Sequence, residues 1–69
     1  RQAKDSFCKA IEIDPKYYDA YNGLGLSLEK SLKYNEAIDI YTKAFQIDPS
    51  KPNAYNNIGD VLFQLSRYN

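Results

Sequence analysis

Small and apolar residues recur along this 69-residue chain at the three- and four-residue spacing of a helical face. The pattern predicts four helices: from Ala3 to a stop at Asp14-Pro15, from about Tyr18 to Ser31, from Asn35 to Asp48-Pro49, and from Pro52 onward. Proline ends a helix because it lacks a backbone donor and disfavours helical geometry in the residue before it. Between the second and third helices we expect a turn at Leu32 and Lys33, with Asn35 as the cap of the next helix.

Each predicted helix has one apolar face, and we expect these faces to form the core of an all-α domain. The residues on these faces are, in chain order, Ala3, Phe7, Ala10 and Ile11; Ala20, Tyr21, Leu24, Gly25 and Leu28; Ala37, Ile38, Tyr41, Ala44 and Phe45; and Ala54, Tyr55, Ile58, Gly59, Leu62 and Leu65. The seven tyrosines mostly fall on such faces. They are therefore interpreted as core residues and not as a platform for stacking.

The whole pattern repeats with a period of 34 residues, and about 14 of 35 aligned positions are identical after this shift. The identical pairs include Ala3/Ala37, Ala10/Ala44, Asp14/Asp48, Pro15/Pro49, Ala20/Ala54, Tyr21/Tyr55, Gly25/Gly59 and Leu28/Leu62. Small residues recur where helices must approach closely, and proline recurs where a helix must end, so the repeat is a packing unit. Residues 18–51 form a complete unit, residues 1–17 the second helix of a preceding unit, and residues 52–69 the first helix of a following one.

This unit resembles the tetratricopeptide repeat, which has an aromatic-x-x-Leu-Gly mark, an Ala-x-x-x-aromatic mark and a closing proline. The residues that carry the resemblance are Tyr21, Leu24, Gly25, Ala37, Tyr41, Ala44 and Pro49, with further marks at Tyr55, Ile58 and Gly59 and at Ala3, Phe7, Ala10 and Pro15. The resemblance covers the whole chain. It implies antiparallel helix-turn-helix units stacked as a short right-handed α-solenoid of four helices.

The chain departs from the family pattern in two ways. Tyr21 and Tyr55 stand where the family usually has tryptophan, and Leu32 and Ser66 stand where it favours glycine in the turn between helices. A leucine at positive φ would cost on the order of 1 kcal/mol or more. We therefore expect either a turn geometry different from the usual one or a helix boundary different from the one placed here.

Composition and charge narrow the choice of partner. Nine basic and nine acidic side chains are interspersed and give a formal net charge of zero, so nucleic acid and membrane surfaces are not expected as partners. The single cysteine, Cys8, permits no internal disulfide, which favours a cytoplasmic or otherwise intracellular setting. No apolar run approaches the length of a membrane span.

The residue types favour a binding module over an enzyme. The chain has no histidine, the usual general base and the commonest metal ligand, so we expect no catalytic, metal or cofactor site. Cys8 lies near Lys4 and Lys9, but no orienting group is in register with it, which favours an ordinary unpaired thiol over a reactive one. The segment Gly23-Leu24-Gly25 lacks the preceding strand and the third glycine of a dinucleotide-binding loop.

In the family that the chain resembles, the free face of each first helix lines a concave groove that binds an extended peptide or a partner helix. The resemblance places seven residues in that groove: Asn22, Leu26, Asn53, Asn56, Asn57, Asp60 and Phe63. Asn57 matches an asparagine that in many members contacts peptide backbone, whereas Gly23 leaves this position of the central unit empty. Only Lys30 is basic on this face, so we do not expect the carboxylate-clamp type of binding. Acidic residues there favour a neutral or basic partner.

Two functions fit these observations. One is a non-catalytic protein-interaction scaffold, and the other is a substrate-selecting repeat segment of a larger multidomain enzyme, such as one resembling the O-linked N-acetylglucosamine transferases. The end helices add a structural expectation: Phe7 and Ala10 at one end, and Ile58, Leu62 and Leu65 at the other, should be exposed. Such complementary ends allow copies of the chain to associate head to tail.

Overall fold

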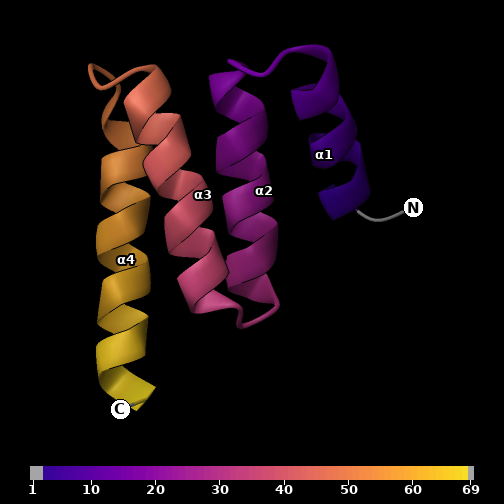
Figure 1. The fold of residues 1–69 in the computed structure, drawn as a ribbon. Helices are drawn as coiled ribbons and strands as arrows, with labels where there is room; N and C mark the ends of the chain where they lie inside the picture. Colours follow the sequence, from indigo (N-terminus) through magenta and orange to yellow (C-terminus); the bar gives the residue numbers. More distant parts are fainter. Residues whose placement is uncertain (1–2, 69) are drawn as a thin grey trace.

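The computed structural model describes residues 3–68, with side-chain burial given for residues 6–67. It contains four α-helices: α1 (Ala3–Ile13), α2 (Tyr18–Lys30), α3 (Tyr34–Ile47) and α4 (Pro52–Tyr68). The helices lie side by side in chain order, and each runs antiparallel to the one before it (Figure 1). Among the described residues α3 packs between α2 and α4, whereas α1 packs on α2 alone. The predicted all-α architecture is confirmed.

The two Asp-Pro connections are built alike, and both lie at the same end of the molecule (Figure 1). Asp14 Oδ1 accepts a hydrogen bond of 3.1 Å from the backbone N–H of Lys16. In the matching place Asp48 Oδ1 accepts bonds from the N–H and the hydroxyl of Ser50, at 3.2 and 2.6 Å. The hydroxyl bond holds the pKa of the Asp48 carboxyl below its usual value. The aspartate of each pair therefore organises the turn that follows, while the proline prevents the helix from continuing.

The turn between α2 and α3 differs from the sequence-based expectations for Leu32 and, as described below, for Asn35. Leu32 has a φ of 64°, in the left-handed region that a leucine was expected to avoid. The reason is the closure of α2, in which the N–H of Leu32 donates to the carbonyl of Glu29 at 3.0 Å and the N–H of Lys33 donates to that of Leu28 at 2.9 Å. This pair of bonds requires a left-handed residue just after the helix, whatever its side chain.

Asn35 is not a helix cap. Helix α3 begins one residue earlier, at Tyr34, and the flanking residue is Lys33, which makes no side-chain capping bond. The left-handed turn reverses the chain within three residues, so α3 starts before Asn35 is reached. Ser66, which was expected in a turn, lies inside α4.

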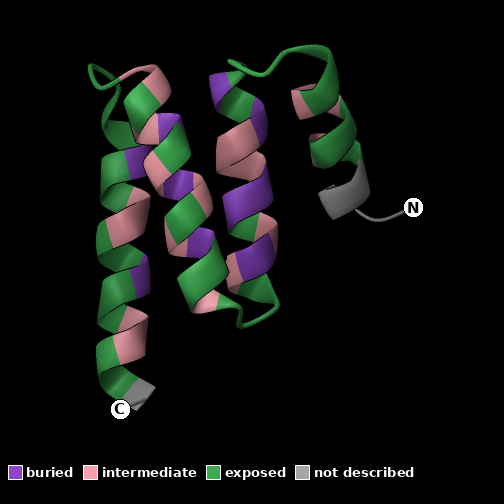
Figure 2. Cartoon of the chain, viewed as in Figure 1, coloured by how far each residue is buried: buried purple, intermediate pink, exposed green. Residues whose placement is uncertain are grey.

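Most of the core lies between α2 and α3. One cluster of buried residues joins Leu24, Leu28, Ala37, Tyr41 and Val61, and a second joins Tyr18, Ala44 and Ala54. Figure 2 shows buried segments concentrated on the two central helices, with α1 and the outer side of α4 mainly exposed or half-buried. The molecule is a thin layer of 37 × 31 × 13 Å, so each helix finds its apolar contacts on its neighbours.

Two glycines of α2 permit close approach of an aromatic ring from either side. A Cβ atom at Gly25 would lie 2.5 Å from the ring of Tyr41 on α3, and one at Gly23 would overlap the ring of Phe7 on α1. The prediction that recurring small residues mark close helix contacts is therefore confirmed at Gly25. The position that Gly23 seemed to leave empty is covered by Phe7.

The buried face of α4 differs from the predicted one. Tyr55 and Leu62 are 67% and 52% exposed and Gly59 is exposed, whereas Val61, which was not predicted, is fully buried. Helix α4 buries the side that meets α3, where the Tyr55 ring lies 6.2 Å from the Phe45 ring but stays mostly in solvent, and a Cβ atom at Gly59 would meet no described atom within 4 Å. The prediction of exposure at the ends is correct for Leu62. It is wrong for Phe7, Ile58 and Leu65, which are half-buried because they pack against the core, and for Ala10, which is half-buried too.

Candidate partner-binding surface

The seven predicted groove residues lie on α2 and α4, the first helices of their units. With Glu29 they form what we call the α2–α4 surface: Asn22, Leu26, Glu29, Asn53, Asn56, Asn57, Asp60 and Phe63. Leu26 and Phe63 are 47% and 62% exposed, although both are large and apolar. Of the six polar members, Asn53, Asn56 and Asp60 are exposed, whereas Asn22, Glu29 and Asn57 are half-buried. Apolar and amide side chains are thus both available on this surface.

Tyr41 of α3 lies beneath the α2–α4 surface and interacts with residues of both α2 and α4. Its ring is fully buried between helices, and its hydroxyl donates a 3.0 Å hydrogen bond to Glu29 Oε1 on α2. Burial raises the pKa of the Tyr41 hydroxyl above its usual range, and the bond to Glu29, the charge of Glu29 and the charge of Asp60 on α4 raise it further. The charges of one carboxylate from each helix therefore act on the same hydroxyl.

Arg67 is a member of the site that the sequence analysis missed. Its guanidinium carbon lies 6.0 Å from the centre of the Phe63 ring, at the outer limit of a cation–π contact. The two residues are four apart on α4, the spacing at which helical side chains meet, and that spacing could have revealed the pair. The expectation that Lys30 is the one basic residue of this face is therefore corrected.

Asn22 is less available than predicted. Its side-chain oxygen is buried and has no hydrogen-bond partner among the described residues. An unsatisfied amide oxygen of this kind costs on the order of 1–3 kcal/mol. Asn57, the preferred contact residue, is half-buried on α4, so it can present only part of its amide to a partner.

Tyr18 fixes one end of the surface by tying the start of α2 to the start of α4. The backbone N–H of Ala54 donates a 3.0 Å hydrogen bond to the Tyr18 hydroxyl, and this buried bond satisfies an N–H in the first turn of α4. The Lys51 ammonium lies over the Tyr18 ring, 4.9 Å from its centre. This 36-residue link has no signal in the helical period, because Tyr18 precedes the first predicted buried position of α2.

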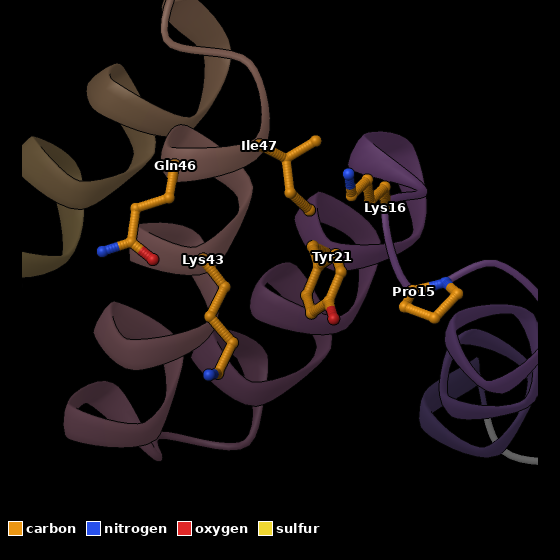
Figure 3. Close-up of a pocket in the computed structure, with 6 residues that line it drawn as sticks. All are labelled: Pro15, Lys16, Tyr21, Lys43, Gln46 and Ile47. Carbon is orange, nitrogen blue, oxygen red and sulfur yellow. The ribbon is translucent and has the colours of Figure 1, made fainter.

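The hollows that the structure describes are lined by residues other than those of the α2–α4 surface. One hollow of about 340 Å³ lies between the α1–α2 turn and α3 (Figure 3) and is lined by Pro15, Lys16, Tyr21, Lys43, Gln46 and Ile47. Its two lysines are exposed side chains, so it is a shallow basic depression and not an enclosed site.

Two family models match the chain. One, described as a TPR repeat, matches residues 33–66, and the other, described as a tetratricopeptide repeat, matches residues 8–39. The chain belongs to the tetratricopeptide repeat family. The four packed helices agree with a stack of this family's helix-turn-helix units. No individual curated protein matched this tetratricopeptide chain.

Further observations concern membrane spans, metal ligands and the single cysteine. Over residues 3–68, no helix combines the length and the apolar character needed to cross a membrane. Over the same residues, no three side chains of the His, Cys, Asp and Glu types gather as a metal site would require. Cys8 is a free, exposed thiol on α1.

Proposed function

We propose that this tetratricopeptide module is a non-catalytic protein-interaction scaffold that binds an extended peptide or a partner helix on its α2–α4 surface. Tetratricopeptide repeats are generally protein–protein interaction modules, which gives the class of function. The observation that carries the finer proposal is the exposure of Leu26 and Phe63 on two first helices whose polar residues meet near the Tyr41 hydroxyl. Exposed apolar side chains with amides beside them are typical of a binding surface.

The chemistry of the surface indicates what a partner would offer. Asn53, Asn56 and Asn57 can each donate to and accept from a peptide backbone. Glu29 and Asp60 favour a basic or neutral segment, and Leu26 and Phe63 favour an apolar side chain next to it. Arg67 beside Phe63 provides one local positive charge, too few for the carboxylate-clamp type of binding, which we do not propose.

The test uses an array of synthetic peptides that vary in charge and apolar content. The strongest binder is then titrated against purified variants by calorimetry or fluorescence anisotropy. Phe63→Ala and Asn57→Ala are expected to weaken binding by about 1–3 kcal/mol, or roughly tenfold or more, if these residues are central contacts. Circular dichroism should show unchanged helicity, because Phe63 lies largely in solvent.

Lys16→Ala is the matched control, since Lys16 is exposed in the α1–α2 turn and far from the surface in sequence. It should bind like the unmodified chain. Unchanged affinity of both Phe63→Ala and Asn57→Ala would contradict the proposed surface. The same surface would select substrates if the module belonged to a larger enzyme, and the sequence that flanks it would separate these two roles.

A further inference from the structure

We propose that the groove between α1 and α3 binds a segment of a partner protein that is acidic at one end, apolar in the middle and basic at the other end. We call this feature the α1–α3 groove. Its floor is formed by α2, and its walls are formed by α1, the α1–α2 turn and α3. None of its lining residues belongs to the α2–α4 surface, so the proposal goes beyond the proposed function and does not depend on it.

The groove exists because α1 and α3 both pack on α2 but, among the described residues, not on each other. Two hollows lie between them, with volumes of about 340 and 250 Å³. Tyr21 lines the first hollow, and Leu24 and Leu28 line the second. These residues have the i, i+3, i+7 spacing of one helical face, so both hollows lie along the same side of α2. Asn22 and Leu26 of the α2–α4 surface lie on another side of this helix.

The α1–α3 groove is complete within the described helices. Each hollow has residues from both walls: Cys8 with Ile40 in one, and Pro15 with Ile47 in the other. The groove is therefore not one face of a helix that lacks a neighbour. Ile40 and Ile47 are half-buried, and they provide apolar contact area for the middle of a bound segment.

The two ends of the groove carry opposite charges. Lys16 and Lys43 line the hollow that Figure 3 shows, next to the α1–α2 turn. Glu36 and Asp39 line the other hollow. All four side chains are exposed, and none of them makes a hydrogen bond or an ion pair with another described residue.

These free charges determine the kind of segment that fits. An acidic residue is attracted to the lysine end, and a basic residue is attracted to the carboxylate end. A segment with a single sign of charge throughout would bring one of its ends against groups of the same sign. The groove should therefore select the order of charges along a segment and not its net charge.

Three synthetic peptides of equal length test this selection. The mixed peptide has glutamates at one end, a leucine-rich middle and lysines at the other end. The second peptide has glutamates at both ends, and the third has lysines at both ends. Fluorescence anisotropy with the purified chain should show that the mixed peptide binds most tightly.

Charge reversal in the groove should change the preference. Lys43→Glu should weaken binding of the mixed peptide about tenfold and improve binding of the peptide with lysines at both ends. Asp39→Lys should also weaken the mixed peptide, but it should improve binding of the peptide with glutamates at both ends. Both residues are exposed on α3, and circular dichroism checks that the variants keep their helices.

Lys9→Glu is the matched control. Lys9 is the equivalent of Lys43 one period earlier, and it is exposed but lines neither hollow. Its charge reversal should leave all three affinities unchanged.

Cys8 reports where the mixed peptide binds, because it is the single cysteine, is exposed and lines the hollow at the carboxylate end. A saturating concentration of the mixed peptide should slow alkylation of Cys8 by iodoacetamide several-fold. The proposal is overturned if alkylation is equally fast with the peptide present. It is also overturned if the mixed peptide binds no better than the other two, or if Lys43→Glu and Lys9→Glu have the same effect.

Phe63→Ala separates this groove from the α2–α4 surface. It should leave binding of the mixed peptide unchanged, because Phe63 lines neither hollow. If Phe63→Ala weakens binding and Lys43→Glu does not, the peptide occupies the α2–α4 surface and the groove proposal is wrong.

Discussion

Tyr41 shows how one side chain can serve both the core and the surface. Its ring fills the contact between α2 and α3, while its hydroxyl emerges beside Glu29. A phenylalanine would fill the same volume but would leave the half-buried Glu29 carboxylate without this donor. Hydrogen bonds to charged groups contribute about 1.5–3 kcal/mol when well shielded, and partial exposure of Glu29 reduces this to about 1 kcal/mol.

Tyr41→Phe should therefore change the dependence of stability on pH. The pKa of Tyr41 is raised in the folded chain above its ordinary value of 10.0. Below that pH both states keep the proton and the stabilisation is complete. Above it the unfolded chain releases a proton that the folded chain retains, so the free energy of unfolding falls, by at most about 1.4 kcal/mol per pH unit.

Urea denaturation at several pH values from neutral to alkaline measures this effect. The unmodified chain should lose stability above pH 10, the ordinary tyrosine pKa, more steeply than Tyr41→Phe. Tyr17→Phe is the control, because Tyr17 is exposed and should leave the pH profile unchanged. Parallel profiles for the unmodified chain and Tyr41→Phe would show that the hydroxyl does not stay protonated in the fold.

Single tyrosines also show the limit of periodicity. The expectation that they mostly form the core is confirmed for four of the six whose burial is described, since Tyr18 and Tyr41 are buried and Tyr21 and Tyr34 are half-buried against the core. Tyr17 and Tyr55 are exposed, although Tyr55 was expected on a core face. The helical period tells which residues share a face, but whether that face is covered depends on which helices lie against it. The same holds for the candidate site, where the period placed Phe63 correctly on an exposed face but did not reveal how deeply Asn22 is buried.

The strained backbone of the turn between α2 and α3 gives a prediction about stability. Leu32 adopts a φ of 64° and is 69% exposed, so its side chain makes little compensating contact. Leu32→Gly should stabilise the fold by up to about 1 kcal/mol, because relief of a left-handed strain of about 1–2 kcal/mol exceeds the extra entropy of glycine in the unfolded chain.

Thermal and urea denaturation of Leu32→Gly measure the change. Leu32→Ala is the control: it removes the same exposed side chain but keeps the Cβ atom that causes the strain, so it should change stability much less. Equal stability of the glycine and alanine variants would mean that the backbone of this turn is not strained. A loss of stability in both would instead indicate that the Leu32 side chain makes contacts that matter.

The helices themselves were the most predictable level of structure. Proline and the 34-residue period placed all four, and both Asp-Pro ends agree with the structure. What the period could not provide were the bonds between distant elements, such as Tyr18 to Ala54, and the choice of left-handed geometry at Leu32. The Tyr18–Ala54 bond depends on where α4 begins, and the geometry at Leu32 depends on how α2 ends. The local pattern of apolar residues does not determine either feature.

The molecule as a whole is a row of helices in which each helix packs on its neighbours. Substitutions at Gly23 and Gly25, the two glycines of α2 that contact aromatic rings, should therefore differ in their effect on stability. Stability in such arrays is approximately a sum over neighbouring contacts. Gly23 meets Phe7 of α1, a half-buried ring on a helix with a single supporting neighbour, and that ring can move toward solvent. Gly25 meets the fully buried ring of Tyr41, which has helices on both sides and no room to move.

Gly23→Ala should therefore release α1 while α2, α3 and α4 stay folded. Gly25→Ala should instead lower the stability of the whole row by about 1–3 kcal/mol through overpacking. The better helix propensity of alanine offsets this loss by up to about 1 kcal/mol. Amide hydrogen exchange distinguishes the two outcomes. Protection should fall only in α1 for Gly23→Ala, and in α2, α3 and α4 together for Gly25→Ala. Gly59→Ala is the control, since its Cβ atom meets nothing within 4 Å and its protection should rise slightly. If Gly23→Ala reduced protection in α4 as much as in α1, the row would unfold as one cooperative unit and the neighbour-by-neighbour description would be wrong.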